Sequence, residues 1–362
     1  MAIDHSCLYI LALTPNGMAL ASRIQALLKE RGKEAIVWLP QTLVSAHVQE
    51  KIRGFESLSQ VMEQAFEKGI ALICIMATGI VVRSIAPFLK GKVQDPAVVV
   101  MDETGRFVIS LLSGHMGGAN ALAQDLAGLM KATPVITTAS DVNGLPSLDL
   151  LAQRHGLLIE DIKAVKAVQS ALLRKEMVYV LDETTELIKV LSTYGLKNLH
   201  GVQVLPEPLP KIGVYVGIKK LPCLKDWLLL RPQELVVGVG CNRGTTTEEI
   251  TSAIGTVFKN FEISILCIKT LASIDAKQNE EGLLRAGEKL KVGIVWHLKE
   301  RLKKIQTPNP SLTVVRHMGV ASVCEAAALL TVLDLGYKTG QLLVPKQKLG
   351  NVTVAVARGC SM

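Results

Sequence analysis

Short apolar runs alternate with amphipathic stretches along the first part of the chain, and this alternation predicts the order of its elements. Three apolar runs have the length of buried strands, at residues 8–13, 35–39 and 70–76. Two stretches with helical spacing, residues 18–31 and 55–68, stop at Gly32 and Gly69, which suit helix C-termini. Strands that alternate with helices in short units predict an open α/β sheet.

The later patterns divide the chain into three parts. We expect an N-terminal α/β domain with an open sheet at residues 1–146, a small middle α/β segment or linker domain at residues 147–232, and a C-terminal α/β domain at residues 233–362. Three prolines interrupt the middle segment, Pro206, Pro208 and Pro210. The C-terminal domain begins with ELVVGVGCNRGTTTEEI, which predicts a buried strand, a glycine-rich turn and a well-capped helix. We interpret LASIDAKQNEEG, further on, as a loop before a charged helix.

Composition supports the α/β architecture and narrows the kind of partner. Hydrophobic residues make up 49% of the chain but aromatic residues only 4%, a composition that suits helices packed on buried parallel strands. The net charge of +8 favours an anionic partner. Because no long Lys/Arg run or zinc-finger spacing occurs, we favour a small polyanion over nucleic acid. The alternative is a basic surface that only contacts solvent.

Cysteine usage and hydropathy indicate a cytoplasmic protein that binds no membrane. The seven cysteines are scattered and never spaced as CxxC, which is typical of reduced thiols rather than of disulfides or zinc ligands. The histidines show no metal-ligand spacing, so we expect no protein-bound metal. The N-terminus lacks a basic region before an apolar core, and no apolar run reaches the ~20 residues of a membrane span.

Polar residues gather at three turns within residues 76–120, each next to a predicted strand. The turns carry Thr78, Gly79 and Arg83, then Asp102, and then Ser113, Gly114, His115, Gly117, Gly118 and Asn120. Loops at strand ends commonly hold reactive groups on a rigid scaffold. We therefore expect the three turns to form one wall of a site, with the GCNRGT turn of the C-terminal domain as the opposite wall.

His115, in SGHMGG, is the strongest candidate for acid–base chemistry, because imidazole exchanges a proton near neutral pH. The amides of Gly117 and Gly118 could stabilise an oxyanion beside it. The alternative is a histidine that only packs in a tight turn or caps it. Ser113 is a candidate nucleophile, but a hydrogen bond to substrate or to the turn explains it more readily, because no GxSxG motif surrounds it.

Asp102 and Arg83 each have a simpler alternative role. Asp102 lies in VVVMDETGRFVIS, two strands joined by a turn, where Asp is an ordinary hairpin residue. It could orient His115 only if the hairpin folds back over the third turn. Arg83 could bind a substrate carboxylate through two hydrogen bonds, or it could pair with a surface acid.

The GCNRGT turn is the candidate anion site of the C-terminal domain, since free N–H groups at such a helix start attract anions. Its residues are Gly240, Cys241, Asn242, Arg243, Gly244 and Thr245. The spacing matches neither GxGxxG nor a Walker motif, so no nucleotide is implied. A second polar group, Ser273, Asp275 and Lys277, could join this site or cap a helix. Cys241 is expected to pack rather than react, and His317 is a weaker counterpart of His115.

With these segments identified, the chain resembles the CbiG family of cobalt-precorrin-5A hydrolases. The resemblance rests on ATGIVVRSIAPFLKGKVQDPAVVVMDETGRFVISLLSGHMGGANALA, VVGVGCNRGTTTEEI, LASIDAKQNEEGLLRAGEKL, and GVASVCEAAALL with the terminal VAVAR. It implies hydrolysis of the δ-lactone of cobalt-precorrin-5A, with the extruded carbon leaving as acetaldehyde, in anaerobic cobalamin biosynthesis. The partner is then a cobalt-corrinoid, and because the cobalt belongs to the substrate, no cofactor is implied.

A corrinoid-binding protein that carries intermediates without chemistry is the alternative from another class. It is motivated by the similarity of the family's C-terminal unit to a stand-alone protein of the aerobic pathway. Either function allows hand-over of the pigment to other enzymes of the pathway. Acetaldehyde release from the lactone would identify the enzyme, and stoichiometric retention of unaltered pigment would identify the carrier.

Overall fold

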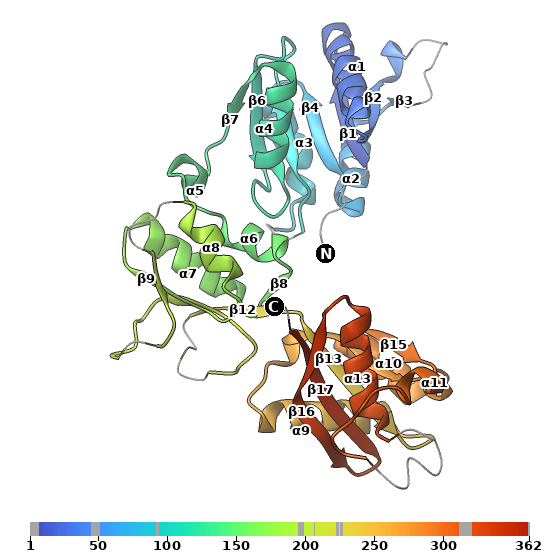
Figure 1. Cartoon of the computed structure of the whole chain (residues 1–362). Helices are drawn as coiled ribbons and strands as arrows, with labels where there is room; N and C mark the ends of the chain where they lie inside the picture. The colour runs from blue at the N-terminus through green and yellow to red at the C-terminus, as the bar shows by residue number, and fades with distance from the viewer. Residues whose placement is uncertain are drawn as a thin grey trace. The chain divides into compact units, whose positions relative to one another are not determined.

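The computed structural model describes residues 7–44, 51–91, 94–194, 199–205, 207–221, 224, 227–310 and 321–360. The chain divides into two compact units, Met1–Gln153 and Arg154–Met362. The described residues form three sheets with helices packed against them, as the α/β prediction requires (Figure 1). His317 lies outside the described residues.

The first unit contains one sheet with the strand order β3-β2-β1-β4-β5-β6-β7. Its strands are β1 (Cys7–Ala12), β2 (Glu34–Pro40), β3 (Ile52–Phe55), β4 (Ala71–Ile75), β5 (Val98–Met101), β6 (Phe107–Leu112) and β7 (Thr133–Val135). The strands β1 to β5 are parallel, whereas β6 runs antiparallel to β5 and β7 runs parallel to β6. The carboxyl ends of β6 and β7 therefore lie at the edge opposite to those of β1 to β5.

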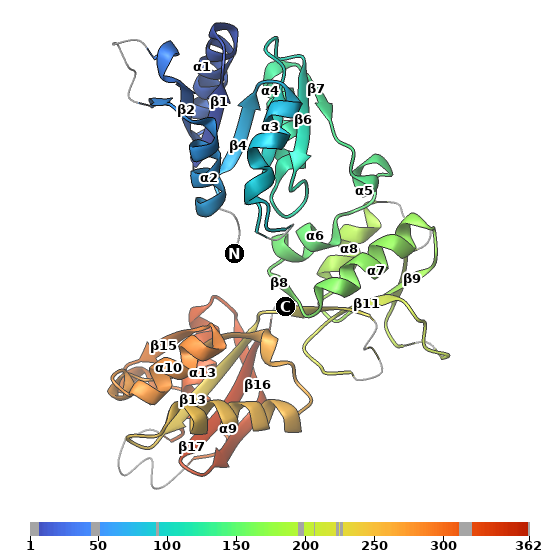
Figure 2. The same ribbon diagram turned by 180° about the vertical axis from the view of Figure 1, so that it is seen from behind.

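Helices cover both faces of this sheet, which explains why its central strands are apolar on both sides. The unit contains α1 (Pro15–Glu30), α2 (Leu58–Lys68), α3 (Thr78–Ile85), α4 (Ala119–Met130), α5 (Ala139–Val142) and the start of α6 (Leu148–Arg154), with the short 3-10 turns η1 (Gln41–Leu43) and η2 (Ala86–Phe88). The helices α1 and α4 bury their apolar residues against one face, and α2 and α3 against the other (Figures 1 and 2). Alternate residues of β4 serve the two cores: Ile73 packs with α1 and α4, and Cys74 with α2 and α3.

Local signals account for the helix ends in this unit. The Thr14 hydroxyl accepts a hydrogen bond from the Gly17 amide at the start of α1, and Pro15 occupies the first turn, where no amide hydrogen is needed. Gly69 ends α2 with φ +65°, a backbone conformation that favours glycine. The predicted helices at residues 18–31 and 55–68 thus correspond to α1 and α2.

The second unit begins with a five-stranded sheet in the order β10-β9-β11-β12-β8. Its elements are β8 (Leu157–Ile159), α7 (Ile162–Leu173), β9 (Val178–Asp182), α8 (Glu186–Ser192), β10 (Leu199–Val202), β11 (Gly213–Val216) and β12 (Leu228–Pro232). The fully buried Arg231 anchors this sheet: its Nε lies 2.6 Å from the Glu160 carboxylate, and its Nη1 donates to the Gly217 and Lys219 carbonyls. A buried guanidinium needs such partners to offset its lost hydration.

The last sheet has the order β15-β14-β13-β17-β16. Its strands are β13 (Leu235–Cys241), β14 (Ile268–Ile274), β15 (Gly293–His297), β16 (Thr339–Leu349) and β17 (Val352–Cys360), and its helices are α9 (Thr247–Asn260), α10 (Glu281–Leu290), α11 (Lys299–Leu302) and α13 (Val323–Asp334), with η4 (Ile265–Cys267) and η5 (Asp275–Lys277). The helices α9 and α10 pack on one face, and α11 and α13 on the other (Figures 1 and 2). The strands β13, β14 and β15 are parallel, so their carboxyl ends share one edge.

The interpretation of LASIDAKQNEEG as a loop is wrong for its first half. Strand β14 continues through this segment to Ile274 and η5 follows, so that only the end of the segment is irregular. Small residues hid the strand, because Ala272 and Ser273 lack the bulk of typical strand residues. Both are fully buried, and the Ser273 hydroxyl donates to the Val239 carbonyl of β13 at 2.7 Å.

Candidate active site

The three predicted turns of the first unit do not lie at one edge of the sheet. Thr78 and Asp102 follow the parallel strands β4 and β5, so they share the carboxyl edge of these strands. Ser113 and His115 follow β6, which runs back along β5 with Val98 opposite Leu112. The expectation of a single wall is therefore wrong: the third turn lies at the opposite edge from the other two.

Asp102 closes the hairpin between β5 and β6 and does not contact His115. Its carboxylate accepts hydrogen bonds from the Thr104 amide at 3.1 Å, the Phe107 amide at 2.7 Å and the Thr104 hydroxyl. Partial burial opposes its charge, but these hydrogen bonds outweigh the burial and hold the pKa of Asp102 below its usual value. The hairpin interpretation of this residue accounts for all of these contacts.

A network of backbone hydrogen bonds shapes the turn that carries His115. The Gly118 amide donates to the His115 carbonyl at 2.9 Å, and the Asn120 amide donates to the Gly114 carbonyl at 3.0 Å. Gly118 has φ +86°, and a Cβ on Gly114 would lie 2.6 Å from the Asn120 Oδ1, so both positions favour glycine. Because the Gly118 amide is already occupied, it does not have the predicted freedom to stabilise an oxyanion.

The imidazole of His115 lies between two carboxylates, and 22% of its side chain is exposed. Its Nε2 is 2.9 Å from the Asp141 Oδ2 and 3.2 Å from the Ser140 Oγ. Its Nδ1 is 4.0 Å from the Asp149 Oδ1. A partly exposed imidazole that is oriented by a carboxylate is the arrangement that general acid–base catalysis requires.

Asn120 lies directly behind this pair and is only 5% exposed. Its Oδ1 accepts from the Ser110 hydroxyl at 2.6 Å, and its Nδ2 donates to the Thr138 hydroxyl and to the Asp141 Oδ2, each at 3.0 Å. The amide of Asn120 is thus engaged within the protein, and this placement argues against its predicted contact with substrate.

Ser113 and Gly117 pack against each other next to the histidine. A Cβ on Gly117 would lie 2.3 Å from the Ser113 Cβ, so only glycine fits there. Ser113 itself has φ +57°, and its buried hydroxyl has no hydrogen-bond partner among the described residues. No serine–histidine dyad is therefore formed, although Ser113 lies two residues from His115.

Arg83 and Thr78 belong to α3, which begins just after the carboxyl end of β4. The Arg83 guanidinium turns back over Gly79, where a Cβ would lie 3.5 Å from its Nη1. The side chain is exposed and forms no ion pair with a described residue. It remains a candidate for binding an anion at the surface.

In the second unit, the GCNRGT turn and the Ser273–Lys277 group meet at one edge, because β13 and β14 are parallel. The Gly244 amide and the Lys277 ammonium each donate to the Glu280 carboxylate, at 3.0 Å in both cases. The hydrogen bond from the Gly244 amide, and to a smaller extent that from Lys277, lower the pKa of Glu280. Two of the predicted anion-binding donors, the Gly244 amide and the Lys277 ammonium, thus bind a carboxylate of the chain itself, that of Glu280.

The other residues predicted at this edge have structural contacts. The Ser273 hydroxyl bonds to β13 as described above, the Asp275 carboxylate accepts from the Ala276 amide at 2.9 Å, and the buried Thr245 hydroxyl donates to the Asn242 carbonyl at 2.9 Å. Burial raises the pKa of the Cys241 thiol, which keeps it protonated and argues against a nucleophile. Among the described residues, no cluster of three His, Cys, Asp or Glu side chains is suited to a metal ion.

Three family models match the chain in order: Cobalamin synthesis G N-terminal at residues 60–141, Cobalamin biosynthesis central region at residues 146–232, and Cobalamin synthesis G C-terminus at residues 235–357. A cobalt-precorrin-5A hydrolase of Priestia megaterium is 34% identical over 360 residues, which cover 96% of this chain and 94% of the relative. The chain belongs to the cobalamin synthesis G family. A cobalt-precorrin-5A hydrolase of Salmonella typhimurium is 36% identical over 360 residues, 96% of this chain and 97% of the relative.

Part of the chain also matches a shorter relative. Protein CobE of a Sinorhizobium species is 27% identical over 125 residues, which cover 34% of this chain and 79% of the relative. The predicted resemblance to the cobalt-precorrin-5A hydrolase family is confirmed by the full-length relatives. Among the described residues, no helix has the length and apolar character needed to cross a membrane.

The His115 site of this family member includes residues that the sequence analysis missed. Thr138, Ser140 and Asp141 follow β7, and they reach His115 because β7 is parallel to β6. The signal was present in the sequence as a polar segment, TTASD at residues 137–141, directly after the apolar pair at residues 135–136. Without the strand order, nothing connected this segment with SGHMGG.

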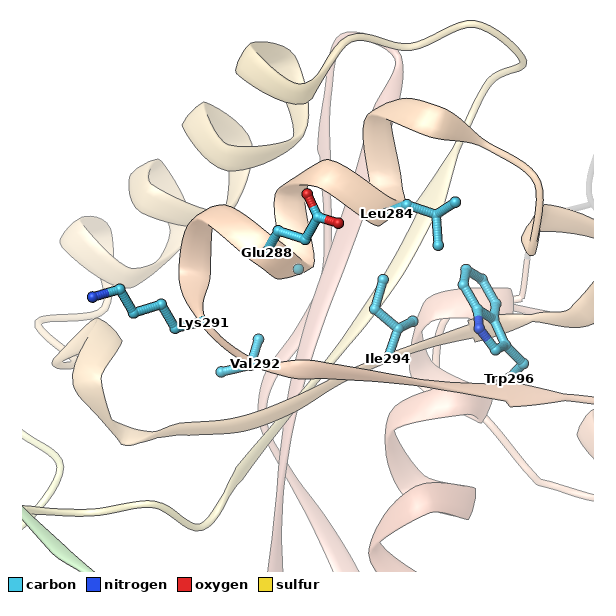
Figure 3. A pocket seen from close by; sticks show the side chains of 7 residues that line it. Leu284, Glu288, Lys291, Val292, Ile294 and Trp296 are labelled. Carbon is cyan, nitrogen blue, oxygen red and sulfur yellow. The ribbon is translucent and has the colours of Figure 1, made fainter. Parts of the chain in front are cut away.

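A pocket of about 460 Å³ lies between α10 and the edge strand β15 of the C-terminal sheet. It is lined by Leu284, Gly287, Glu288, Lys291, Val292, Ile294 and Trp296. Figure 3 shows Leu284 and Trp296 at one end and Lys291 at the other. The lining is mainly apolar, and it offers no histidine to the chemistry expected of the family.

Proposed function

We propose that this chain hydrolyses the δ-lactone of cobalt-precorrin-5A and releases the extruded carbon as acetaldehyde, giving cobalt-precorrin-5B. The observation that carries the proposal is the match to two cobalt-precorrin-5A hydrolases over 96% of the chain. The cobalt is part of the substrate, and we propose no cofactor of the protein's own. The reduced cysteine pattern supports action in the cytoplasm.

His115 is proposed as the acid and base of the hydrolysis. The neutral imidazole takes a proton from water while the water oxygen bonds to the lactone carbonyl carbon, and the carbonyl electron pair moves onto its oxygen. As the tetrahedral intermediate collapses, the ring carbon–oxygen bond breaks. The imidazolium then returns the proton to the departing oxygen. This leaves a hydroxyl group and a carboxylic acid, which loses its remaining proton to solvent as a carboxylate.

Acetaldehyde release follows from the hydroxyl group that hydrolysis exposes. A base removes the hydroxyl proton, the carbon–oxygen bond becomes a carbonyl, and the adjacent carbon–carbon bond breaks. The electron pair of the broken bond stays on the macrocycle, which is then protonated. The same imidazole can move both protons, since each step returns it to the neutral form.

Exposed arginines are proposed to bind carboxylates of the corrinoid. The candidates, each taken within its own unit, are Arg83 in the first unit and Arg243 of the GCNRGT turn in the second. Guanidinium and ammonium groups bind carboxylates through charge-assisted hydrogen bonds. The net charge of +8 is consistent with such a substrate.

The decisive experiment replaces His115. We expect His115→Gln to lower the rate of acetaldehyde release from the purified lactone by at least roughly 100-fold, because general acid–base groups commonly contribute this much. His155→Gln, a change at an exposed position, is the matched control and should keep the wild-type rate. Unchanged acetaldehyde release by His115→Gln would contradict the assignment of the base.

The carrier alternative is not favoured, because the relatives that match the whole chain are hydrolases by name. It predicts that one equivalent of unaltered pigment stays bound after incubation with the lactone, with no acetaldehyde formed. Absorption spectra of the bound and released pigment, recorded with an acetaldehyde assay, separate the two functions.

A further inference from the structure

The two nitrogens of the His115 ring face different carboxylates, at 2.9 Å for Asp141 and 4.0 Å for Asp149. We infer that Asp149 is a second catalytic residue, which holds the hydrolytic water together with the Nδ1 of His115. In this assignment Asp141 and Asn120 are positioning residues that direct the lone pair of the ring toward Asp149. The inference rests on the proposed function and specifies the geometry of its first step.

The protonation of the ring follows from what Asn120 does to Asp141. Because an ionised carboxylate only accepts, the Asn120 Nδ2 is the atom that faces Asp141, and the Asn120 Oδ1 accepts from the Ser110 hydroxyl at 2.6 Å. The Asp141 Oδ2 therefore accepts a hydrogen bond from Asn120. An ionised carboxylate oxygen has no hydrogen to donate, so in its contact with His115 the ring nitrogen must be the donor. Consequently Nε2 carries the proton of the neutral ring, and Nδ1 carries the free electron pair.

The separation of 4.0 Å between Nδ1 and the Asp149 Oδ1 is too long for a direct hydrogen bond but suits one shared water. Two hydrogen bonds of roughly 2.8 Å that meet at close to a right angle span such a distance. A water held in this way donates one proton to each partner. Its lone pairs then point away from both, toward a substrate.

Asp149 is itself held in place for this task. Its Oδ1 accepts hydrogen bonds from the Ser147 hydroxyl and the Leu150 amide, the second at 3.0 Å. Only 16% of its side chain is exposed, against 22% for His115, so both groups are largely shielded from bulk solvent. Carboxylate and imidazole are thus presented as a rigid pair, which is the condition for orienting a small nucleophile.

The reaction step keeps its atoms and electrons in balance. As the water oxygen bonds to the lactone carbonyl carbon, the proton directed at Nδ1 moves to the ring, and the other proton stays on the new hydroxyl group, hydrogen-bonded to Asp149. The carbonyl electron pair moves to its oxygen. The imidazolium is then stabilised by carboxylates at both nitrogens until it returns the proton to the leaving oxygen.

The first test measures turnover by the full chain with Asp149→Asn. We expect kcat to fall roughly 100-fold with KM changed less than about threefold, because the amide keeps the shape but presents a donor on one side. Asp125→Asn, an exposed carboxylate on α4 of the same unit, is the matched control and should keep wild-type turnover. Asp149→Ala removes the carboxyl group altogether, so its kcat should fall at least as far as that of Asp149→Asn.

The second test needs no substrate and reports the ring directly. Nitrogen-15 NMR of the neutral His115 ring should show Nε2 protonated in the wild type, and a mixture of the two neutral forms in Asn120→Ala and Asp141→Asn. Thr138→Val, which removes only the other acceptor of the Asn120 amide, should keep the wild-type form. A wild-type ring protonated at Nδ1 would overturn the inference.

The two proposals fail in different ways. If the wild type releases no acetaldehyde from the lactone, the proposed function fails, and the water assignment fails with it. If the wild type turns over and Asp149→Asn retains more than about a third of its kcat, only the role of Asp149 is overturned. A loss of turnover in Asp149→Asn, with thermal unfolding like that of Asp125→Asn, supports both.

Discussion

Ser113 combines two unfavourable features at a single position. Its φ of +57° lies in the left-handed region, which costs a residue with a Cβ roughly 1 kcal/mol relative to glycine. Its buried hydroxyl also has no hydrogen-bond partner among the described residues. A residue selected only for stability would have neither the left-handed backbone conformation nor the unpartnered hydroxyl. Substitutions of Ser113 can therefore test effects on stability and on activity separately.

Replacing Ser113 by glycine is expected to raise the free energy of unfolding by about 1 kcal/mol, because glycine adopts the same backbone conformation without strain. Ser113→Ala keeps the strain and removes only the hydroxyl, so it is the matched control for the backbone contribution. Urea titration of both variants measures the difference. Equal stability of the two would contradict the role of backbone strain.

Turnover of the same two variants distinguishes the possible roles of the hydroxyl. With His115 as the base, we expect Ser113→Ala to retain most of its acetaldehyde release. A loss of about 100-fold or more in both variants would instead assign the nucleophile to Ser113.

The residues of the proposed site differ in how far the sequence could predict them. His115 was identifiable because an imidazole in a glycine-rich turn after a strand has few structural reasons to be there. Asp141 and Asp149 were not identifiable, since carboxylates are common in polar segments. Whether one of them lies near His115 depends on which strand ends meet, and this cannot be read from the sequence. Asn120 was identified, but as a contact of the substrate, because its burial cannot be read from the sequence.

At the scale of elements, the direction of β6 decides which edge of the sheet carries the proposed base, His115. The sequence DETG already indicated a hairpin, and a hairpin returns the chain to the edge from which it came. That argument alone would have placed SGHMGG opposite Asp102, but the concentration of polar turns favoured one wall. The crossover through α4 then makes β7 parallel to β6, and this brings Asp141 to the histidine.

The contact between β13 and α13 depends on Gly238. A Cβ at this position would lie 1.8 Å from the Cys324 carbonyl oxygen, a backbone atom that cannot turn aside. We expect Gly238→Ala to lower the free energy of unfolding of the C-terminal sheet by about 3 kcal/mol. Gly255→Ala, on α9 with nothing within 4 Å of its Cβ, should instead stabilise by about 1 kcal/mol.

Hydrogen exchange of amides in β13 and α9 measures both changes in the intact protein. Lower protection in Gly238→Ala together with higher protection in Gly255→Ala would support the close approach of strand and helix. Similar protection in both variants would contradict it.

At the scale of the whole molecule, the sequence predicted the class of the fold better than its details. The alternation of apolar runs and helical stretches was sufficient for the α/β class, since buried parallel strands are apolar on both faces. The strand β16 was not recognised, because only one of its eleven residues, Val344, is buried and its sequence, TGQLLVPKQKL, contains a proline and several polar residues. An edge strand carries such residues without cost, which removes the pattern that identifies strands.

Net charge is the whole-molecule property that we connect with function. The chain carries +8 and its proposed substrate carries carboxylates, so their attraction should weaken as salt shortens the Debye length from about 10 Å at 0.1 M. We expect KM to rise severalfold between about 0.1 M and 1 M NaCl with little change in kcat. Acetaldehyde release at increasing lactone concentrations gives both constants.

Two variants with the same change in net charge distinguish a direct contact with the substrate from long-range attraction by the net charge of the protein. Arg243→Gln and Lys259→Gln each remove one positive charge, but Arg243 adjoins the Gly244 amide, and Lys259 lies in the last turn of α9. If Arg243 binds a substrate carboxylate, only Arg243→Gln should raise KM by about tenfold and reduce its salt dependence. Equal and small effects of the two variants would mean that the charge acts over long range alone, and the GCNRGT turn would then lose its role in substrate binding.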